Sequence, residues 1–162
     1  MGLFYGLTGV EIILMLLGVI LFLVLLFILV YQVIKKMSYK YLLPFFLIPV
    51  LMIGFSSIKK ISYDNGVIDI EKTTEEVKKN PDNQEARKAL SEKIGAIESR
   101  AASDPSALVT IAKANLVLGD TVKAHKTVNQ AVKLQPGLIQ AKELKFKLDK
   151  RMLHKMPISE KK

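Results

Sequence analysis

One long apolar run constrains this chain more than any other feature. Residues 12–34 are almost all aliphatic or aromatic, and Lys35-Lys36 closes the run. As an α-helix rising about 1.5 Å per residue, the run reaches roughly 34 Å, which is enough to cross the hydrocarbon core of a bilayer. No basic residue precedes it and no small-residue cleavage site follows it, which argues against a removable signal peptide. We therefore expect a retained membrane span at 12–34.

A second apolar run covers residues 41–58 and ends at Lys59-Lys60. It is short but long enough to span a bilayer, and Pro44 and Pro49 should kink it. A re-entrant or interfacial segment is the alternative reading. Because the link between the two runs is tight, we expect an antiparallel transmembrane hairpin that occupies residues 1–60.

The lysines around these runs predict an orientation. The N-terminal tail has none, whereas the link between the runs and the far flank carry Lys35, Lys36, Lys40, Lys59 and Lys60. The positive-inside rule then places the link in the cytoplasm and both termini on the periplasmic side of a bacterial inner membrane. More distant lysines, at positions 72, 78 and 79, favour the opposite orientation if they are included in the count of flanking positive charges.

Charge is concentrated after residue 60. The chain has 162 residues, 24 Lys and Arg against 15 Asp and Glu, and a formal net charge of +9. The apolar start and the charged remainder predict a membrane part followed by one small all-helical domain. The positive charge favours anionic partners, whether lipid headgroups, acidic proteins or nucleic acid. The absence of cysteine excludes disulfides and thiolate chemistry.

We expect residues 61–81 to form a linker with one short helix. Asn65-Gly66 between apolar residues is a hairpin-turn signal, although an extended linker with one turn is equally compatible. Thr73-Thr74 followed by Glu75-Glu76 resembles a capping box for a short helix that ends before Pro81.

A helical domain should then occupy residues 82–152, followed by a basic tail at 153–162. Asp82 with Glu85 predicts the start of its first helix, whose apolar residues are Ala86, Leu90, Ile94, Ile97 and Ala101. The last helix carries Ala141, Leu144 and Leu148 on one face.

Between these helices, residues 104–136 predict a helical hairpin. Asp104 can cap a helix whose first turn contains Pro105, and Gly119-Asp120 ends that helix and caps the next. Pro136-Gly137 ends the second helix. The apolar stripes are Leu108, Ile111, Ala112, Leu116 and Leu118 on the first helix, and Ala124, Val128, Ala131, Val132 and Leu134 on the second.

The same hairpin resembles a tetratricopeptide (TPR) repeat. The matching positions are Leu108, Ile111, Ala112 and Asn115 on the first helix and Ala124, Val128, Ala131 and Pro136 on the second. Leu108 replaces the tryptophan and Asn115 the tyrosine that are usual in the family. The resemblance implies a small TPR-like domain with one clear repeat between two capping helices. Together with the two apolar runs, this predicts an all-α fold in which a two-helix transmembrane hairpin precedes the TPR-like domain.

No residue constellation predicts a reaction. The two histidines, His125 and His154, have no second histidine or carboxylate at metal-ligand spacing. The sequence contains no Gly-rich phosphate loop, no G-x-S-x-G motif and no nucleic-acid recognition motif. We expect a protein without enzymatic activity, cofactor, metal or nucleic-acid partner.

The resemblance also implies a binding surface, because the first helix of a TPR repeat lines a concave groove. Its candidate residues here are Val109, Lys113, Leu116 and Val117. Such a mixed apolar and basic groove suits a partner segment with acidic and aliphatic residues. The alternative is that Lys113 is solvated and the aliphatic residues pack on neighbouring helices.

The function that these observations favour is a membrane-anchored scaffold or adaptor that recruits a protein partner at the membrane, in contact with its lipids. The alternative is a structural accessory subunit of a larger transporter, motor or respiratory assembly. The layout is similar to that of the TPR subunit of cytochrome c maturation systems, although the link between the spans is shorter here. The sequence is compatible with an oligomer.

Overall fold

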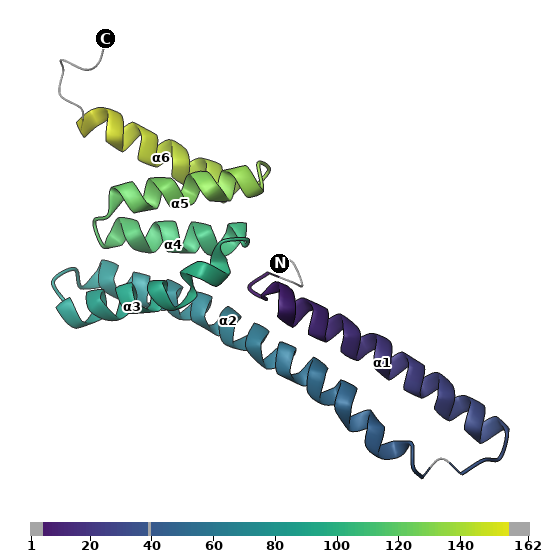
Figure 1. Cartoon of the computed structure of the whole chain (residues 1–162). Helices are drawn as coiled ribbons and strands as arrows, with labels where there is room; N and C mark the ends of the chain where they lie inside the picture. Colours follow the sequence, from purple (N-terminus) through teal and green to yellow (C-terminus); the bar gives the residue numbers. More distant parts are fainter. Residues whose placement is uncertain (1–4, 39, 156–162) are drawn as a thin grey trace. The chain divides into compact units, whose positions relative to one another are not determined.

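The protein is all-helical in a computed structural model that describes residues 5–38 and 40–155 (Figure 1), and no strand occurs among them. The expected all-α class is therefore confirmed. The helices are α1 (Gly9–Ile34), the 3-10 helix η1 (Leu43–Phe46), α2 (Leu47–Lys79), α3 (Gln84–Ala101), α4 (Pro105–Val117), α5 (Thr121–Leu134) and α6 (Ile139–Lys155). The predicted tail at 153–162 begins inside α6, and its remainder lies outside the described residues.

The chain divides into two units, which we describe separately. The apolar unit comprises Leu7–Ser62, and the helical domain comprises Tyr63–Lys162 together with Met1–Gly6. Helix α2 contributes its first half to the apolar unit and its second half to the helical domain.

Helix α1 of the apolar unit begins with a capping box. The backbone N–H of Thr8 donates to Glu11 Oε2 at 2.8 Å, and the N–H of Glu11 donates to Thr8 Oγ1 at 3.4 Å. These bonds satisfy two backbone donors that the first helical turn leaves open, and the carboxylate complements the positive end of the helix dipole. A local signal thus fixes where the apolar helix starts.

Three contacts join α1 to η1 and α2. Residues later in α1 contact residues earlier in the second segment, so the two segments run antiparallel. Ser56 Oγ donates to the carbonyl of Glu11 at 3.0 Å, and the rings of Phe22 and Phe46 meet edge to face at 5.6 Å between centroids. Between them, a Cβ placed on Gly18 would lie 3.0 Å from Ile53. A larger residue at position 18 would therefore push the two helices apart.

Both helices are long and apolar enough to span a membrane by length and composition, as the sequence led us to expect. Their apolar side chains are mostly exposed in the described structure. Leu17, Leu23 and Phe27 of α1 are more than half exposed, as are Leu47 and Leu51 of α2. This exposure distinguishes them from the core helix of a soluble domain, which buries such side chains.

The predicted linker at 61–81 is wrong, because α2 continues as one helix to Lys79. Thr73 and Thr74, expected to start a new helix, instead donate their hydroxyls to the carbonyls one turn earlier, at 2.8 and 2.6 Å. The reason is tertiary packing. Every seventh residue of this segment is buried (Tyr63, Ile70 and Val77), and Gly66 lies against Ile97 of α3. That packing outweighs the local turn propensity of Asn65-Gly66.

Helix α4 is the centre of the helical domain, because its two faces enter two different cores. One core joins it to α2 and α3 and consists of Tyr63, Ile70, Val77, Ala86, Leu90, Ile94, Ile97, Ala101, Ala107, Ile111 and Ala114. The other joins it to α5 and α6 and consists of Leu108, Val109, Ala112, Ala124, Val128, Ala131, Ala141 and Leu148. Figure 1 shows α4, α5 and α6 stacked in chain order.

The predicted starts of the two helices in the 104–136 hairpin are confirmed by their caps. Asp104 accepts from the N–H groups of Ser106 and Ala107 at 3.0 and 3.2 Å, with Pro105 at the first helical position. Asp120 caps α5 by accepting from Lys123 N at 2.9 Å, after Gly119 has turned the chain with a φ of +90°. One cap differs from expectation: Asn83, not Asp82, starts α3, by accepting from Ala86 N at 3.0 Å.

Candidate functional site: a basic groove

A surface groove of about 320 Å³ lies on the helical domain, and alternate helices line it. Helix α2 contributes one residue, α4 three and α6 four. The lining residues are Lys78, Lys113, Leu116, Val117, Leu144, Lys147, Leu148 and Arg151.

The floor of this groove is aliphatic and continuous with the core. Leu148 is fully buried, and Leu116 and Leu144 are partly buried against the core that joins α4, α5 and α6. Val117 is partly buried against the other core. The floor therefore consists of side chains that folding already holds in place, so a ligand would contact a preformed apolar surface.

The rim of the groove is cationic. Lys78, Lys113, Lys147 and Arg151 are all exposed, and no acidic residue is among the lining residues. Lys147 and Arg151 are four residues apart on α6, so their side chains lie one helical turn apart on one face. Four basic side chains around an apolar floor, one of which (Lys78) is ion-paired with Glu75, favour an anionic, partly aliphatic ligand.

Lys113 holds a special place on this rim. From Ala107 to Val117, α4 is buried or partly buried at every position except Lys113. Only a narrow strip of the helix reaches the surface there, and a lysine occupies it inside the groove. A charged side chain at the one open position of a central helix adds nothing to either core, which makes it the strongest candidate for a binding role.

One carboxylate lies beside the rim without lining the groove. Glu75 accepts a hydrogen bond from Lys78, and this bond, followed by the positive charge of Lys78, holds the pKa of the Glu75 carboxyl below its usual value. The charges of Lys79 and Lys113 act in the same direction. An exposed carboxylate is thus stabilised by direct contact with a rim cation, which is the interaction that an acidic ligand would make.

Three of the four residues expected from the sequence line this groove, namely Lys113, Leu116 and Val117. Val109 does not: it is 1% exposed and packs in the core between α4, α5 and α6. The prediction that Val109 lies on the binding surface is therefore wrong. Helix α4 is buried on opposite faces, so it has less exposed surface than a helix at the edge of a domain.

Sequence reasoning missed the contribution of α6. Lys147 and Arg151 had no place in the binding surface expected from the sequence. Lys147 and Arg151 are spaced three residues after Leu144 and Leu148, which places basic and apolar residues along one side of the helix. This spacing could have identified the two basic residues from the sequence. Lys78 was missed because it was assigned to a separate short helix.

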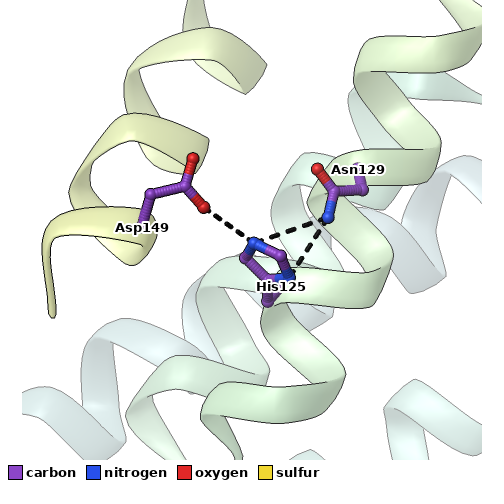
Figure 2. A network of polar contacts seen from close by, with 3 residues as sticks. All are labelled: His125, Asn129 and Asp149. Atoms are coloured by element: carbon purple, nitrogen blue, oxygen red, sulfur yellow. Dashed lines mark hydrogen bonds and ion pairs between the residues drawn. The ribbon is translucent and has the colours of Figure 1, made fainter. Parts of the chain in front are cut away.

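A second polar cluster joins α5 to α6 (Figure 2). Nε2 of His125 lies 2.7 Å from Oδ1 of Asp149, and the amide nitrogen of Asn129 lies 3.1 Å from Nδ1 of the same ring. Because a carboxylate only accepts hydrogen bonds, Nε2 carries the proton and Nδ1 accepts from Asn129. All three side chains are partly exposed. The cluster adds a polar contact between α5 and α6. Within the described residues, no group of three metal-ligating side chains is placed to hold a metal ion.

We expect Asp149→Ala to lower the free energy of unfolding of the helical domain by about 0.5–1.5 kcal/mol, the range for losing one hydrogen bond. Partial exposure of both partners places the effect toward the lower end. Chemical denaturation followed by circular dichroism measures it. Glu143→Ala, at an exposed position of the same helix, is the matched control and should leave the transition unchanged. Equal effects of the two variants would contradict a role for the His125 contact.

No family model matches this chain, and neither the curated proteins nor the solved structures contain a significant match.

Proposed function

We propose that this chain is a membrane-anchored adaptor that binds a protein partner in the basic groove. The observation that carries the proposal is the groove itself: an aliphatic floor enclosed by four cationic side chains from α2, α4 and α6. Its partner is a segment with acidic and aliphatic residues. In this proposal the chain binds and positions its partner and catalyses no reaction.

The two kinds of side chain in the groove have separate tasks. Aliphatic partner residues on Leu116, Val117 and Leu144 would supply most of the affinity, because these side chains are only partly buried and burying apolar area is favourable and non-directional. The rim cations would fix the orientation of the segment and reject basic competitors, since exposed charges contribute more to specificity and association rate than to affinity.

The apolar unit supports the anchoring half of the proposal. We propose that α1 and the first part of α2 cross the membrane as a hairpin, with their exposed apolar side chains in lipid. Following the lysine distribution, both termini would lie on the periplasmic side of a bacterial inner membrane. The TPR resemblance stays a prediction, and it would account for a groove that draws on every second helix.

A binding measurement with the full chain in phosphatidylcholine nanodiscs tests the proposal. The probe is a short fluorescent peptide of alternating Glu and Leu, followed by anisotropy, with a Lys and Leu peptide as the comparison. We expect the acidic peptide to bind at least about tenfold more tightly. Lys113→Glu should weaken it by about tenfold, which corresponds to about 1.4 kcal/mol.

The matched control is Lys88→Glu, which reverses an exposed lysine on α3 outside the groove. It should leave the affinity within about twofold of the original protein, because Lys88 does not line the groove and salt screens exposed charges that are not in direct contact. Equal affinity for the two peptides, or equal losses in the two variants, would contradict the groove as the binding site.

A further inference from the structure

Two features of the structure require a glycine at position 6, which belongs to the helical domain. Its φ is +78°, a left-handed conformation that other residues adopt only with strain. In addition, a Cβ at this position would lie 2.0–2.4 Å from three ring atoms of Tyr63. The backbone of Gly6 therefore lies directly against the tyrosine ring, closer than any residue with a side chain could approach.

Arg100 of α3 holds the same residue from another direction. Its Nε donates to the carbonyl of Gly6 at 2.9 Å, and its guanidinium carbon lies 5.9 Å from the centre of the Tyr63 ring. Gly6 is buried, although it belongs to the short segment that precedes α1. A terminal segment is ordinarily poorly ordered unless specific contacts hold it.

Tyr63 connects this contact to the central helix. Its hydroxyl donates to Oδ2 of Asp104 at 3.2 Å, and the other carboxylate oxygen of Asp104 caps α4. Burial, and next the nearby Asp104 charge, raise the pKa of the Tyr63 hydroxyl above its ordinary value, so it remains a protonated donor. One ring thus joins the segment before α1 to α2 and to the corner between α3 and α4.

We propose that Tyr63, Arg100 and Asp104 form a receptor for residues 5 and 6 of the same chain, and that this clasp holds these two residues on the same side of the membrane as the helical domain. The clasp itself rests on contacts within the helical domain, whereas its consequence for sidedness rests on the proposed membrane anchor. It is separate from the basic groove, because none of its residues lines that groove.

Hydrogen exchange of the full chain in detergent, read by mass spectrometry on the backbone amides of residues 5–8, tests the clasp. In Gly6→Ala we expect these amides to exchange at least about tenfold faster, because the left-handed backbone and the ring contact are both lost. Gly9→Ala is the matched control, since a Cβ there meets nothing within 4 Å and its φ is not positive. It should exchange at the original rate.

A second pair of variants removes the arginine contact without adding a side chain next to the ring. Arg100→Gln should also speed exchange at residues 5–8, by several-fold. Arg87→Gln is its control: Arg87 is on the same helix and also donates to a backbone carbonyl, that of Leu118 at 2.9 Å. It should leave residues 5–8 unchanged. The clasp would be overturned if residues 5–8 exchanged at the original rate in both Gly6→Ala and Arg100→Gln.

Sidedness is tested by labelling Tyr5→Cys and Ser106→Cys in sealed membrane vesicles with an impermeant maleimide, which the absence of native cysteine makes clean. Both positions should label from the same side. Labelling from opposite sides would overturn the sidedness consequence and the two-span anchor together. Same-side labelling with unchanged exchange in the Gly6→Ala and Arg100→Gln variants would overturn the clasp alone and leave the anchor standing.

Discussion

Ile111→Ala should lower the free energy of unfolding of the helical domain by about 2–5 kcal/mol. Ile111 is 0% exposed and lies in the core that joins α2, α3 and α4. Removing three carbons there deletes contacts within this core and leaves a cavity that close-packed neighbours fill only in part. Small domains have stabilities of about 5–15 kcal/mol, so this single change removes a large share.

Urea denaturation of the full chain in detergent, followed by circular dichroism, measures this effect. The matched control is Ile139→Ala, which makes the same chemical change at a side chain that is 69% exposed at the start of α6. That variant should stay within about 0.5 kcal/mol of the original protein. A loss below about 1 kcal/mol for Ile111→Ala would contradict the position of α4 between two cores.

Leu51→Arg should abolish insertion of the second apolar helix. Leu51 is near the middle of the run at 41–58, and its side chain is 62% exposed in the apolar unit. An arginine at the centre of a span opposes insertion by about 2.5–3.5 kcal/mol. This run is short and contains Pro44 and Pro49. Its apolar side chains therefore favour insertion too weakly to offset the free-energy cost of the arginine. Ser106→Cys should then label from the opposite side of sealed vesicles.

Leu23→Arg in α1 is the comparison, because Leu23 is 57% exposed and equally central. The apolar run of α1 at 12–34 is longer than the run at 41–58 and is almost without polar residues in its middle, so α1 should still insert with one arginine present. Labelling at Ser106→Cys should then be unchanged. If Ser106→Cys labels from the original side in Leu51→Arg as well, the prediction is contradicted, and the second run does not span the membrane.

The parts of the fold that the sequence predicted well are those set by local chemistry. Asp104 with Pro105, and Gly119 with Asp120, set helix boundaries through bonds within a few residues, and such signals can be read without the rest of the structure. The apolar runs at 12–34 and 41–58 were equally readable, because a nearly unbroken run of aliphatic residues needs no partner to be recognised.

The errors came where distant packing decides. Asn65-Gly66 is a turn signal in isolation, but the heptad spacing of Tyr63, Ile70 and Val77 packs α2 on α3 and α4 and keeps the segment helical. In the same way, Val109 seemed free because one face of its helix had been assigned to the core. The helix has two buried faces, and only the packing of α3 and α5 against it reveals the second.

The groove shows the same division between local and distant information. Lys113, Leu116 and Val117 could be named from one helix, because a repeat-like pattern marks which face is packed. The cations from α2 and α6 could not, since they join the site only when helices distant in sequence come together. A complete basic rim is therefore a property of the tertiary structure, and it is the feature on which the proposed adaptor function depends.

Site-specific photocrosslinking in native membranes tests this function most directly. A benzophenone amino acid placed at Lys147, on the groove, is compared with one placed at Lys142, an exposed position of α6 outside it. We expect one discrete protein adduct from position 147 only, and we expect Lys113→Glu to remove it. Equal adducts from both positions, or an adduct that persists at full yield with Lys113→Glu, would contradict partner binding in the basic groove.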